Sequence, residues 1–322
     1  MEKPPCTLTP QIALLIGEVS ELLGRYRGVH APVPNPRLRK KNTVRTIQGS
    51  VAIEGNSLAL QQVTALLDNK RVIGTQSEIL EVQNAIALYE FLPSLNVFQP
   101  KDLLRAHRVL MSGLAFDAGK YRRGAVGIFK GRRVAHVAPS AKFVPTLVAA
   151  LLRYAKHQKT LPRVVVACIV HYELEFIHPF SDGNGRIGRA WQTALLMREN
   201  KAFAFTPVES IIHARQKEYY QALAVADRLA DAAPFVEFSL QAIRDALREF
   251  LAQLVPTRHS ALDRLALAKD DFGTRSFNRA DYLRCVGGIS TATASRDLAL
   301  GAKQGQLRAH YHHAQTTYRF YG

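Results

Sequence analysis

The chain of 322 residues has little cysteine, few acidic residues and no long apolar run. Its cysteines, Cys6, Cys168 and Cys285, lie too far apart for a disulfide framework or a metal-binding cluster, so we expect reduced thiols. The longest apolar run, residues 164–170, is broken by His171 and is far shorter than the roughly 20 residues of a membrane-spanning helix. We therefore expect a protein without membrane spans.

The N-terminus lacks the features of a secretory signal, which are a basic start, a long apolar stretch and a small-residue cleavage site. A cytoplasmic protein is therefore expected. Acidic residues number 26 against 43 lysines and arginines, which gives a formal net charge of +17. Such a surface attracts nucleic acid, nucleotide phosphates or an acidic protein, but charge alone does not choose among these partners.

Helical patterns dominate the sequence. Apolar residues recur at helical spacing over 9–26, and Pro32, Pro34 and Pro36 then predict an extended connector. A second helix is expected from about residue 42 to Glu54, where Gly55 supplies a stop. Further helices are predicted over residues 59–69, 77–92 and 100–113.

The pattern changes between Tyr121 and Pro139, where two short β-prone runs flank the segment 130–133 and predict a hairpin. Helices resume near Ala141. Residues 162–176 are apolar almost all round, which indicates a central helix that ends just before His178.

The segment that follows carries the chemistry: His178-Pro-Phe-Ser-Asp-Gly-Asn-Gly-Arg-Ile-Gly-Arg189. Gly183 and Gly185 allow a tight turn before a helical run, and unpaired amides at a helix start favour phosphate. Arg186 and Arg189 are three residues apart, so both guanidinium groups can reach one polyanion.

Two further side chains complete this pattern. Asp182 offers a hard oxygen ligand for Mg²⁺ beside the phosphates, and His178 can act as a general base because the unperturbed pKa of histidine lies near neutrality. Each of these features alone has a structural alternative, in which the glycines cap a helix and the histidine is only packed in the core. Together they place a base, a metal ligand and a phosphate site within twelve residues.

The whole segment resembles the signature of the Fic family, His-x-Phe-x-Asp/Glu-Gly-Asn-Gly-Arg-x-x-Arg, at every defined position. The resemblance implies that His178 deprotonates a target hydroxyl and that Asp182 holds Mg²⁺. It also implies a phosphate-binding loop lined by Gly183, Asn184 and Gly185, with Arg186 and Arg189 on the phosphates of ATP. Such a transfer depends on positioning and charge stabilisation.

The resemblance extends to two other regions. Residues 119–122, the hairpin and the segment from His136 and Val137 to Pro139 look like the Fic flap, which aligns the target by strand pairing and borders the nucleotide. An ordinary surface hairpin is the alternative. Residues 215–223 are similar to the helix that closes the adenosine pocket, which implies that Tyr219 or Tyr220 contacts the adenosine. The alternative is that these tyrosines only pack in the hydrophobic core.

An upstream segment, from Ser50 to Glu54 and Gly55, resembles the inhibitory motif of the Fic subclass that carries it before the catalytic signature. In a helix Ser50 and Glu54 face the same side. The resemblance implies that Glu54 pairs with Arg189, the group that should receive the γ-phosphate, and disfavours the reactive pose. In relatives the same glutamate is proposed to assist AMP removal, so hydrolysis of a modified target stays open.

The tail beyond about Pro256 is expected to be a separate module. Helical segments at 261–268, 276–285 and 291–298 precede two alternating strands around 307–311 and 316–320, which is the order of a winged-helix domain. If it binds DNA, the groove-facing candidates are Thr291, Thr293, Ser295 and Arg296. A protein-interaction or dimerisation role is the alternative. No carboxylate or cysteine pattern supports metal binding by His310, His312 and His313.

The sequence thus predicts a mainly α fold: a Fic-type helical core with a β-hairpin flap and a small C-terminal winged-helix domain. Four segments are expected: an N-terminal region at 1–95 with the inhibitory helix at about 42–55, a catalytic core at 96–207, a helical extension at 208–255 and the terminal domain at 256–322.

The predicted activity is transfer of AMP from ATP, with Mg²⁺, to a Ser, Thr or Tyr hydroxyl of a target protein. Self-modification and a homodimer stay open. The alternatives are a nucleotide-sensing DNA-binding regulator and a Fic enzyme that uses another phosphate-containing donor.

Overall fold

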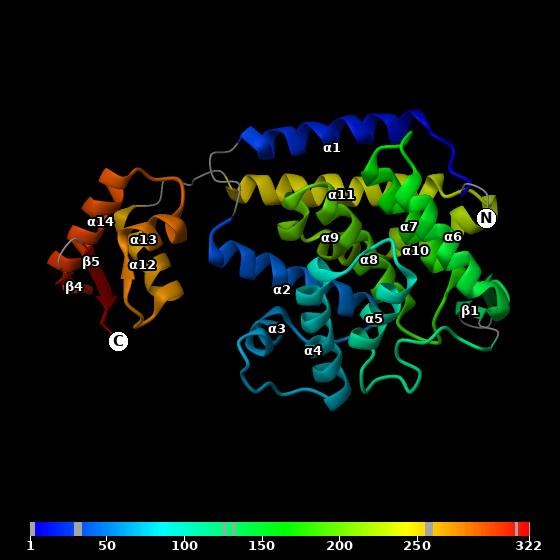
Figure 1. Ribbon diagram of the computed structural model, residues 1–322, viewed down its shortest axis with the longest axis horizontal. Coiled ribbons are helices and arrows are strands. Elements are labelled where there is room, and N and C mark those ends of the chain that lie inside the picture. Colours follow the sequence, from blue (N-terminus) through cyan, green and yellow to red (C-terminus); the bar gives the residue numbers. More distant parts are fainter. Residues whose placement is uncertain are drawn as a thin grey trace. The chain divides into compact units, whose positions relative to one another are not determined.

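A computed structural model describes residues 4–28, 34–124, 127–130, 133–254, 260–312 and 315–321. Over 127–130 and 133–137 it describes the backbone alone. The described residues form fourteen α-helices and two small antiparallel sheets, which confirms the prediction of a mainly α fold (Figure 1). None of these helices is long and apolar enough to cross a membrane.

The chain divides into two compact units. The larger comprises Met1–Gly24 and Thr43–Arg248, and the smaller comprises Arg25–Asn42 and Glu249–Gly322. The first half of the chain supplies these elements: α1 (Pro10–Gly28), α2 (Pro36–Ile53), α3 (Leu60–Leu67), α4 (Gln76–Phe91), the short 3-10 helix η1 (Leu92–Ser94) and α5 (Pro100–Leu110).

The middle of the chain supplies the rest of the larger unit. Its elements are β1 (Gly127–Lys130), β2 (Arg133–Val137), η2 (Ala141–Phe143), α6 (Val144–His157), α7 (Arg163–Ile177), α8 (Asn184–Glu199), η3 (Lys201–Phe205), α9 (Val208–Ala214), α10 (Gln216–Leu229) and α11 (Ala233–Leu254). The predicted hairpin is present, because β1 pairs with β2 antiparallel. Its tip at residues 131–132 and the positions 125–126 lie outside the described residues.

The core of the larger unit forms around α7 and α8. Almost every side chain of α7 is buried, as its all-round apolar sequence predicts, and α8 buries Trp191 completely. Helix α1 lies along α11 (Figure 1), where Glu18 accepts hydrogen bonds from Arg244 and Arg248 at 3.0 and 3.1 Å. A buried α7–α8 pair places the loop between them, residues 178–183, against rigid elements.

The expected start of the second helix was wrong. Helix α2 begins at Pro36 rather than near Asn42, because Asn35 Oδ1 accepts a hydrogen bond from the Leu38 amide at 2.8 Å and so caps the helix. Proline is favourable in the first turn of a helix, where its missing N–H costs nothing. Pro36 therefore starts a helix at a position that was expected to belong to the extended connector.

The smaller unit contains α12 (Ala261–Phe272), β3 (Phe277–Asn278), α13 (Arg279–Val286), α14 (Thr291–Lys303), β4 (Leu307–His312) and β5 (Gln315–Phe320). The three strands form one sheet in the order β3-β5-β4. Strand β3 was not predicted, because two residues are too few to show a periodic pattern. Helices and strands in this order are consistent with the winged-helix interpretation.

Apolar side chains from every element of this module meet in one cluster that includes Leu265, Tyr282, Leu298 and Phe320. Tyr282 and Arg264 both donate hydrogen bonds to the buried Asp297 carboxylate. The module therefore has a core of its own, independent of the larger unit.

Candidate active site

His178 lies at the C-terminal end of α7, where it takes the left-handed backbone conformation with φ 49° and ψ 62°. Its amide closes the last turn of the helix on the Leu174 carbonyl at 3.0 Å. The ring nitrogen Nδ1 lies 3.3 Å from the Glu175 carbonyl oxygen. If Nδ1–H donates to that carbonyl, Nε2 is left as the proton acceptor, which is the arrangement that a general base needs.

Arg122 holds the backbone around His178 in place. This buried side chain donates from Nε to the His178 carbonyl at 2.7 Å and from Nη2 to the Ile177 carbonyl at 3.3 Å. It also donates to the carbonyls of Gly124 and Pro139, which flank the β1–β2 hairpin on its two sides. One guanidinium group therefore ties both ends of the hairpin to the residue that carries the candidate base.

The loop after His178 is closed by Asn184. Its side-chain oxygen accepts from the Phe180 amide and its side-chain nitrogen donates to the Phe180 carbonyl, both at 2.9 Å. The Phe180 ring stacks on the imidazole of His107 from α5, with centroids 3.6 Å apart. These contacts fix the loop from both sides.

His107 supports the loop as a neutral side chain. Gly119 N–H donates to Nδ1 and Nε2 lies 2.9 Å from the Asp182 carbonyl oxygen, so the proton is on Nε2. Burial lowers the pKa of His107 and so favours its neutral form, although the hydrogen bond to the Asp182 carbonyl acts in the opposite direction. Gly183 follows with φ 79°, and an added Cβ there would meet Met111 Sδ at 2.7 Å.

Helix α8 begins at Asn184, directly after this glycine. Its first-turn amides have no partner within the helix, and its dipole favours an anion at this end. The carboxylate of Glu54 lies over this helix start, because a Cβ built on Gly185 would fall 2.5 Å from Glu54 Oε1. Because Gly185 has no side chain, an anion can come close to the start of α8, and in this structure the Glu54 carboxylate occupies that space.

Glu54 pairs with Arg189. Nη2 of Arg189 donates to Glu54 Oε1 at 2.7 Å and to the Ser50 carbonyl at 3.0 Å, with a longer contact from Nε to Ser50 Oγ at 3.5 Å. The Arg189 side chain is 1% exposed and that of Glu54 is 31% exposed. Burial opposes the charge on Arg189, but the charge of Glu54 and its hydrogen bond, together with Tyr219 and Glu175, raise the pKa of Arg189 above its ordinary value. Arg189 is thus a buried cation held by one partly exposed anion.

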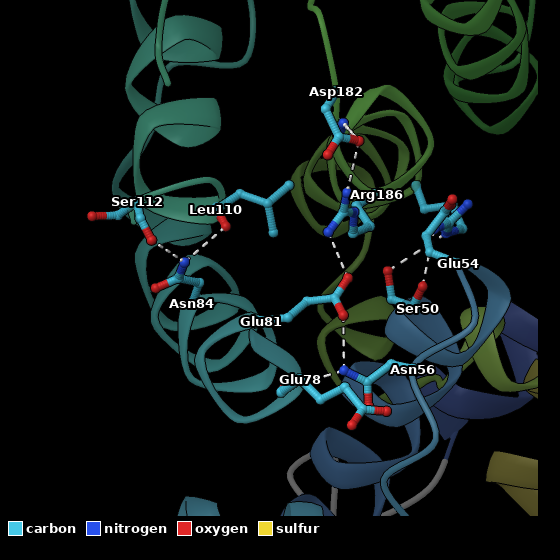
Figure 2. A network of polar contacts seen from close by, with 12 residues as sticks. Ser50, Glu54, Asn56, Glu78, Glu81, Asn84, Leu110, Ser112, Asp182 and Arg186 are labelled. Carbon is cyan, nitrogen blue, oxygen red and sulfur yellow. Dashed lines mark hydrogen bonds and ion pairs between the residues drawn. The ribbon is translucent and has the colours of Figure 1, made fainter. Parts of the chain in front are cut away.

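Arg186 has different partners, shown in Figure 2. Its Nη1 pairs with Glu81 Oε1 of α4 at 2.5 Å, and its Nη2 donates to Asp182 Oδ1 at 3.0 Å. Glu81 Oε2 in turn accepts from the Asn56 side chain at 2.8 Å. The two arginines of the segment 178–189 therefore contact three carboxylates from three different segments, Arg186 those of Glu81 and Asp182 and Arg189 that of Glu54.

The C-terminal end of α2 is attached at several points. Tyr220 and Gln216 of α10 both donate to the Ile53 carbonyl, at 3.3 and 2.7 Å. Arg45 donates to Ser210 Oγ at 3.1 Å. At Gly49 the helix lies directly on α9, since an added Cβ would come within 2.7 Å of the backbone of Glu209 and Ser210. These contacts hold Glu54 over the start of α8.

Two helical glycines provide a test of this packing. Gly49→Ala should push α2 away from α9 and lower the free energy of unfolding by about 1–3 kcal/mol, the usual effect of overpacking. Gly17→Ala on α1 meets nothing within 4 Å and should raise stability by about 0.5–1 kcal/mol. Urea unfolding midpoints check both signs. Equal shifts for the two variants would contradict the close contact at Gly49.

Tyr219 and Tyr220 occupy different environments. Tyr219 is buried, and its hydroxyl lies 3.3 Å from both His171 Nε2 and Glu175 Oε1. Burial would raise the pKa of Glu175, but hydrogen bonding to His171 and nearby positive charge leave it below its usual value. Tyr220 is partly exposed, so it is the more accessible of the two candidates for an adenosine contact.

Asp182 is the predicted Mg²⁺ ligand, and its carboxylate is 64% exposed. Its Oδ1 accepts from the Gly183 amide at 2.6 Å as well as from Arg186. No group of three or more His, Cys, Asp or Glu that could hold a metal occurs among the described residues. One exposed carboxylate at an anion site fits Mg²⁺, which takes its other ligands from phosphates and water.

The structure thus brings together most of the residues predicted from the sequence: Ser50, Glu54, His178, Asp182, Gly183, Asn184, Gly185, Arg186 and Arg189. The backbone of His136 and Val137 lies on β2, opposite Ile128 and Gly127, but their side chains lie outside the described residues. Sequence reasoning did not identify the supporting residues Asn56, Glu81, His107 and Glu175. The partners of Glu81 and His107 lie far away in the chain, and no local spacing signals them, whereas the spacing of His171, Glu175 and His178 at the end of one helix is a local signal that could have identified Glu175.

Comparisons with known proteins identify one family. The Fic/DOC family matches residues 97–196. A Fic family protein from Desulfovibrio desulfuricans G20 is 42% identical, and its crystal structure matches with a TM-score of 0.77 over 99% of this chain and 98% of that one. Fic-1 from C. elegans, at 24% identity and a TM-score of 0.62 over 76% of this chain and 72% of that one, shares the fold.

Curated relatives give the same family. The protein adenylyltransferase Fic of Nematostella vectensis is 30% identical over 281 residues, which cover 81% of this chain and 63% of that protein. The corresponding Drosophila melanogaster protein is 30% identical over 251 residues, or 71% of this chain and 48% of that protein. The chain therefore spans about half to two thirds of the length of these relatives.

Proposed function

The chain belongs to the Fic family, and from this premise we propose that it transfers AMP from ATP to a hydroxyl group of a protein. The relatives named protein adenylyltransferase support this reaction class. The pairing of Glu54 with Arg189 at the start of α8 carries the proposal further, because it puts an anion where a phosphate would bind.

In the proposed reaction His178 Nε2 accepts the proton of the target hydroxyl. The hydroxyl oxygen attacks the α-phosphorus of ATP, the bond from that phosphorus to the oxygen bridging the β-phosphate breaks, and pyrophosphate leaves with the bonding electrons. The amides at the start of α8 and Arg189 neutralise the phosphates, and Asp182 would hold Mg²⁺, which would supply further charge neutralisation when bound. In this proposal the acceleration of the transfer comes from the positioning of the two reactants and from stabilisation of the phosphate charge.

We further propose that Glu54 inhibits this reaction. Its carboxylate takes the Arg189 donor that the γ-phosphate requires, and it lies over Gly185 at the helix end. A nucleotide that binds beside Glu54 cannot reach the reactive pose, since two anions would compete for one cation. The test is Mg²⁺-dependent AMP attachment to proteins of a lysate and to the chain itself. Attachment by Glu54→Gly supports the proposal, and its absence from every acceptor would oppose it.

Removal of AMP from a modified target is a second reaction open to the same site. The Glu54 carboxylate is partly exposed, and its Oε1 lies 2.7 Å from Arg189 Nη2. In this position it is accessible to water and can accept a proton from it. Another phosphate-containing donor in place of ATP is also open, and competition of ATP with CTP, GTP and UTP for transfer by Glu54→Gly identifies the preferred donor.

For the smaller unit we propose binding of double-stranded DNA. Its residues 260–321 carry nine Lys and Arg against five Asp and Glu. Arg308 and Arg319 are exposed and lie directly opposite each other on β4 and β5, although like charges in that arrangement repel. Arg296 is exposed in the first half of α14. A phosphate backbone would neutralise the opposed arginines, and α14 would face the groove.

Fluorescence anisotropy with a labelled duplex tests this second proposal. Arg308→Ala/Arg319→Ala should reduce the slope of log affinity against log salt by about two, one for each lost phosphate contact. Arg284→Ala, which removes a cation paired with Asp281, is the matched control and should change the slope little. His178→Ala should leave the affinity unchanged. An unchanged slope in the double variant would rule out this surface.

A further inference from the structure

Arg186 lies between two carboxylates, and this distinguishes it from Arg189. Figure 2 shows its guanidinium group between Glu81 and Asp182, at 2.5 Å from the first and 3.0 Å from the second. The side chains of Arg186 and Glu81 are only 10% and 13% exposed, whereas that of Asp182 is 64% exposed. The buried part of this arrangement is therefore the Glu81–Arg186 pair, and the part that faces solvent is Asp182.

The charges indicate what Arg186 can do. One guanidinium group already paired with two carboxylates has little positive charge left for phosphate. Arg189, in contrast, forms an ion pair with one carboxylate, that of the partly exposed Glu54, which a phosphate can displace. The two arginines of the same helix are thus suited to different tasks.

Glu81 is itself held in a fixed position. Its Oε2 accepts from Asn56 Nδ2 at 2.8 Å, and the same Asn56 nitrogen donates to the Glu78 carbonyl at 3.1 Å. Asn56 is buried and its Oδ1 accepts from the Leu58 amide, so its orientation is fixed as well. The order Asn56, Glu81, Arg186 and Asp182 forms one continuous line of hydrogen bonds and ion pairs (Figure 2).

We propose that Glu81 is a positioning residue that fixes Arg186, and that Arg186 acts chiefly by orienting the Asp182 carboxylate for a divalent cation. This inference rests on the proposed function, because the cation is the Mg²⁺ that accompanies ATP. With Oδ1 held by Arg186 and by the Gly183 amide, Oδ2 is the Asp182 oxygen that we assign to the cation. Glu81 thus acts at a distance on the metal site, through two side chains.

The chain offers a matched pair of variants on one helix face. Glu81→Gln removes the charge that holds Arg186 and replaces one of the two accepting oxygens, which bind Arg186 and Asn56 separately, with an NH2 group that cannot accept a hydrogen bond. Glu78 is three residues earlier on α4 and contacts the same segment, since its carboxylate accepts from the Ser57 amide at 2.9 Å. Its side chain has no contact with Arg186 among those described, so Glu78→Gln is the control.

The experiment uses the full chain with Glu54→Gly as the parent, so that the proposed inhibition is absent. Mn²⁺ binding is measured by electron paramagnetic resonance in the presence of ATP with a methylene group between the α- and β-phosphorus, which blocks turnover. The dissociation constant of the cation should rise about 10- to 100-fold in Glu81→Gln, the usual effect of losing an outer support of a metal ligand, and little in Glu78→Gln. In turnover, the Mg²⁺ requirement should rise by a similar factor, while the KM for ATP at saturating Mg²⁺ stays within about twofold of the parent.

Asn56→Ala is the second variant, because it loosens Glu81 without touching Arg186 and should give a smaller shift in the same direction. If Glu81→Gln leaves Mn²⁺ binding unchanged, or weakens nucleotide binding equally with and without the cation, Glu81 does not act through Asp182 and the inference is overturned. A parent that binds Mn²⁺ and ATP but transfers nothing would refute the proposed function alone. The Mn²⁺ comparison between Glu81→Gln and Glu78→Gln would still decide the inference.

Discussion

Glu54→Gly is expected to raise the rate of AMP transfer about 10- to 100-fold over the wild-type chain. A charge-assisted hydrogen bond to a buried arginine contributes about 1.5–3 kcal/mol, and each 1.4 kcal/mol is a factor of ten in the fraction of reactive complexes. Removing the carboxylate frees Arg189 Nη2 and opens the space above Gly185. The fold should tolerate the change, because Glu54 lies in the turn after α2 and not within the helix.

The effect is measured as the initial rate of AMP incorporation into protein at fixed ATP and Mg²⁺. Asp68→Gly is the matched control, since Asp68 is also an acidic residue directly after a helix of the larger unit and caps α3. Its rate should equal that of the wild type. Equal rates for Glu54→Gly and Asp68→Gly would show that the Glu54–Arg189 pair does not limit the reaction.

His178→Ala, introduced into the Glu54→Gly chain, is expected to lower the transfer rate about 10²- to 10⁴-fold, the contribution typical of a positioned general base. The loop should survive, because the contacts that hold this position are made by its backbone to Leu174 and Arg122. Alanine adopts the left-handed backbone conformation less readily than histidine does. His178→Asn is therefore included, since asparagine tolerates that backbone and cannot act as the base.

A second histidine provides the control for this loss. His157 at the end of α6 places its Nδ1 2.9 Å from the Arg153 carbonyl one turn earlier, and His178 likewise places its Nδ1 near a carbonyl of the last turn of α7, that of Glu175. His157→Ala should retain full activity. Binding of ATP, followed by calorimetry, should be unchanged in all three variants. If His178→Asn transfers AMP at the parent rate, another group removes the proton.

Local patterns predicted much of the site. The signature from His178 to Arg189 specifies a turn, a helix start and charges within a few residues of one another, so their proximity follows from the chain itself. The spacing of Ser50 and Glu54 predicted that both face one side, and both contact Arg189. The resemblance, and not the spacing, supplied the identity of the partner.

The supporting contacts could not be predicted in this way. Glu81 on α4 precedes Arg186 on α8 by 105 positions, and Arg122 before β1 precedes His178 by 56, so only the folding of distant segments brings each pair together. The start of α2 depended on whether Pro36 ends or begins a helix, and the Asn35 cap decides it. Long-range packing and capping are physical effects that a local pattern does not contain.

The identity of the transferred group is the central claim, and ATP labelled at either the α- or the γ-phosphate tests it most directly. The Glu54→Gly chain is incubated with Mg²⁺, a lysate and each form of labelled ATP in parallel, and protein-bound label is counted. AMP transfer predicts label on protein from α-labelled ATP, none from γ-labelled ATP, and loss of the signal with His178→Ala. Label from the γ-phosphate, or from neither position, would contradict the account.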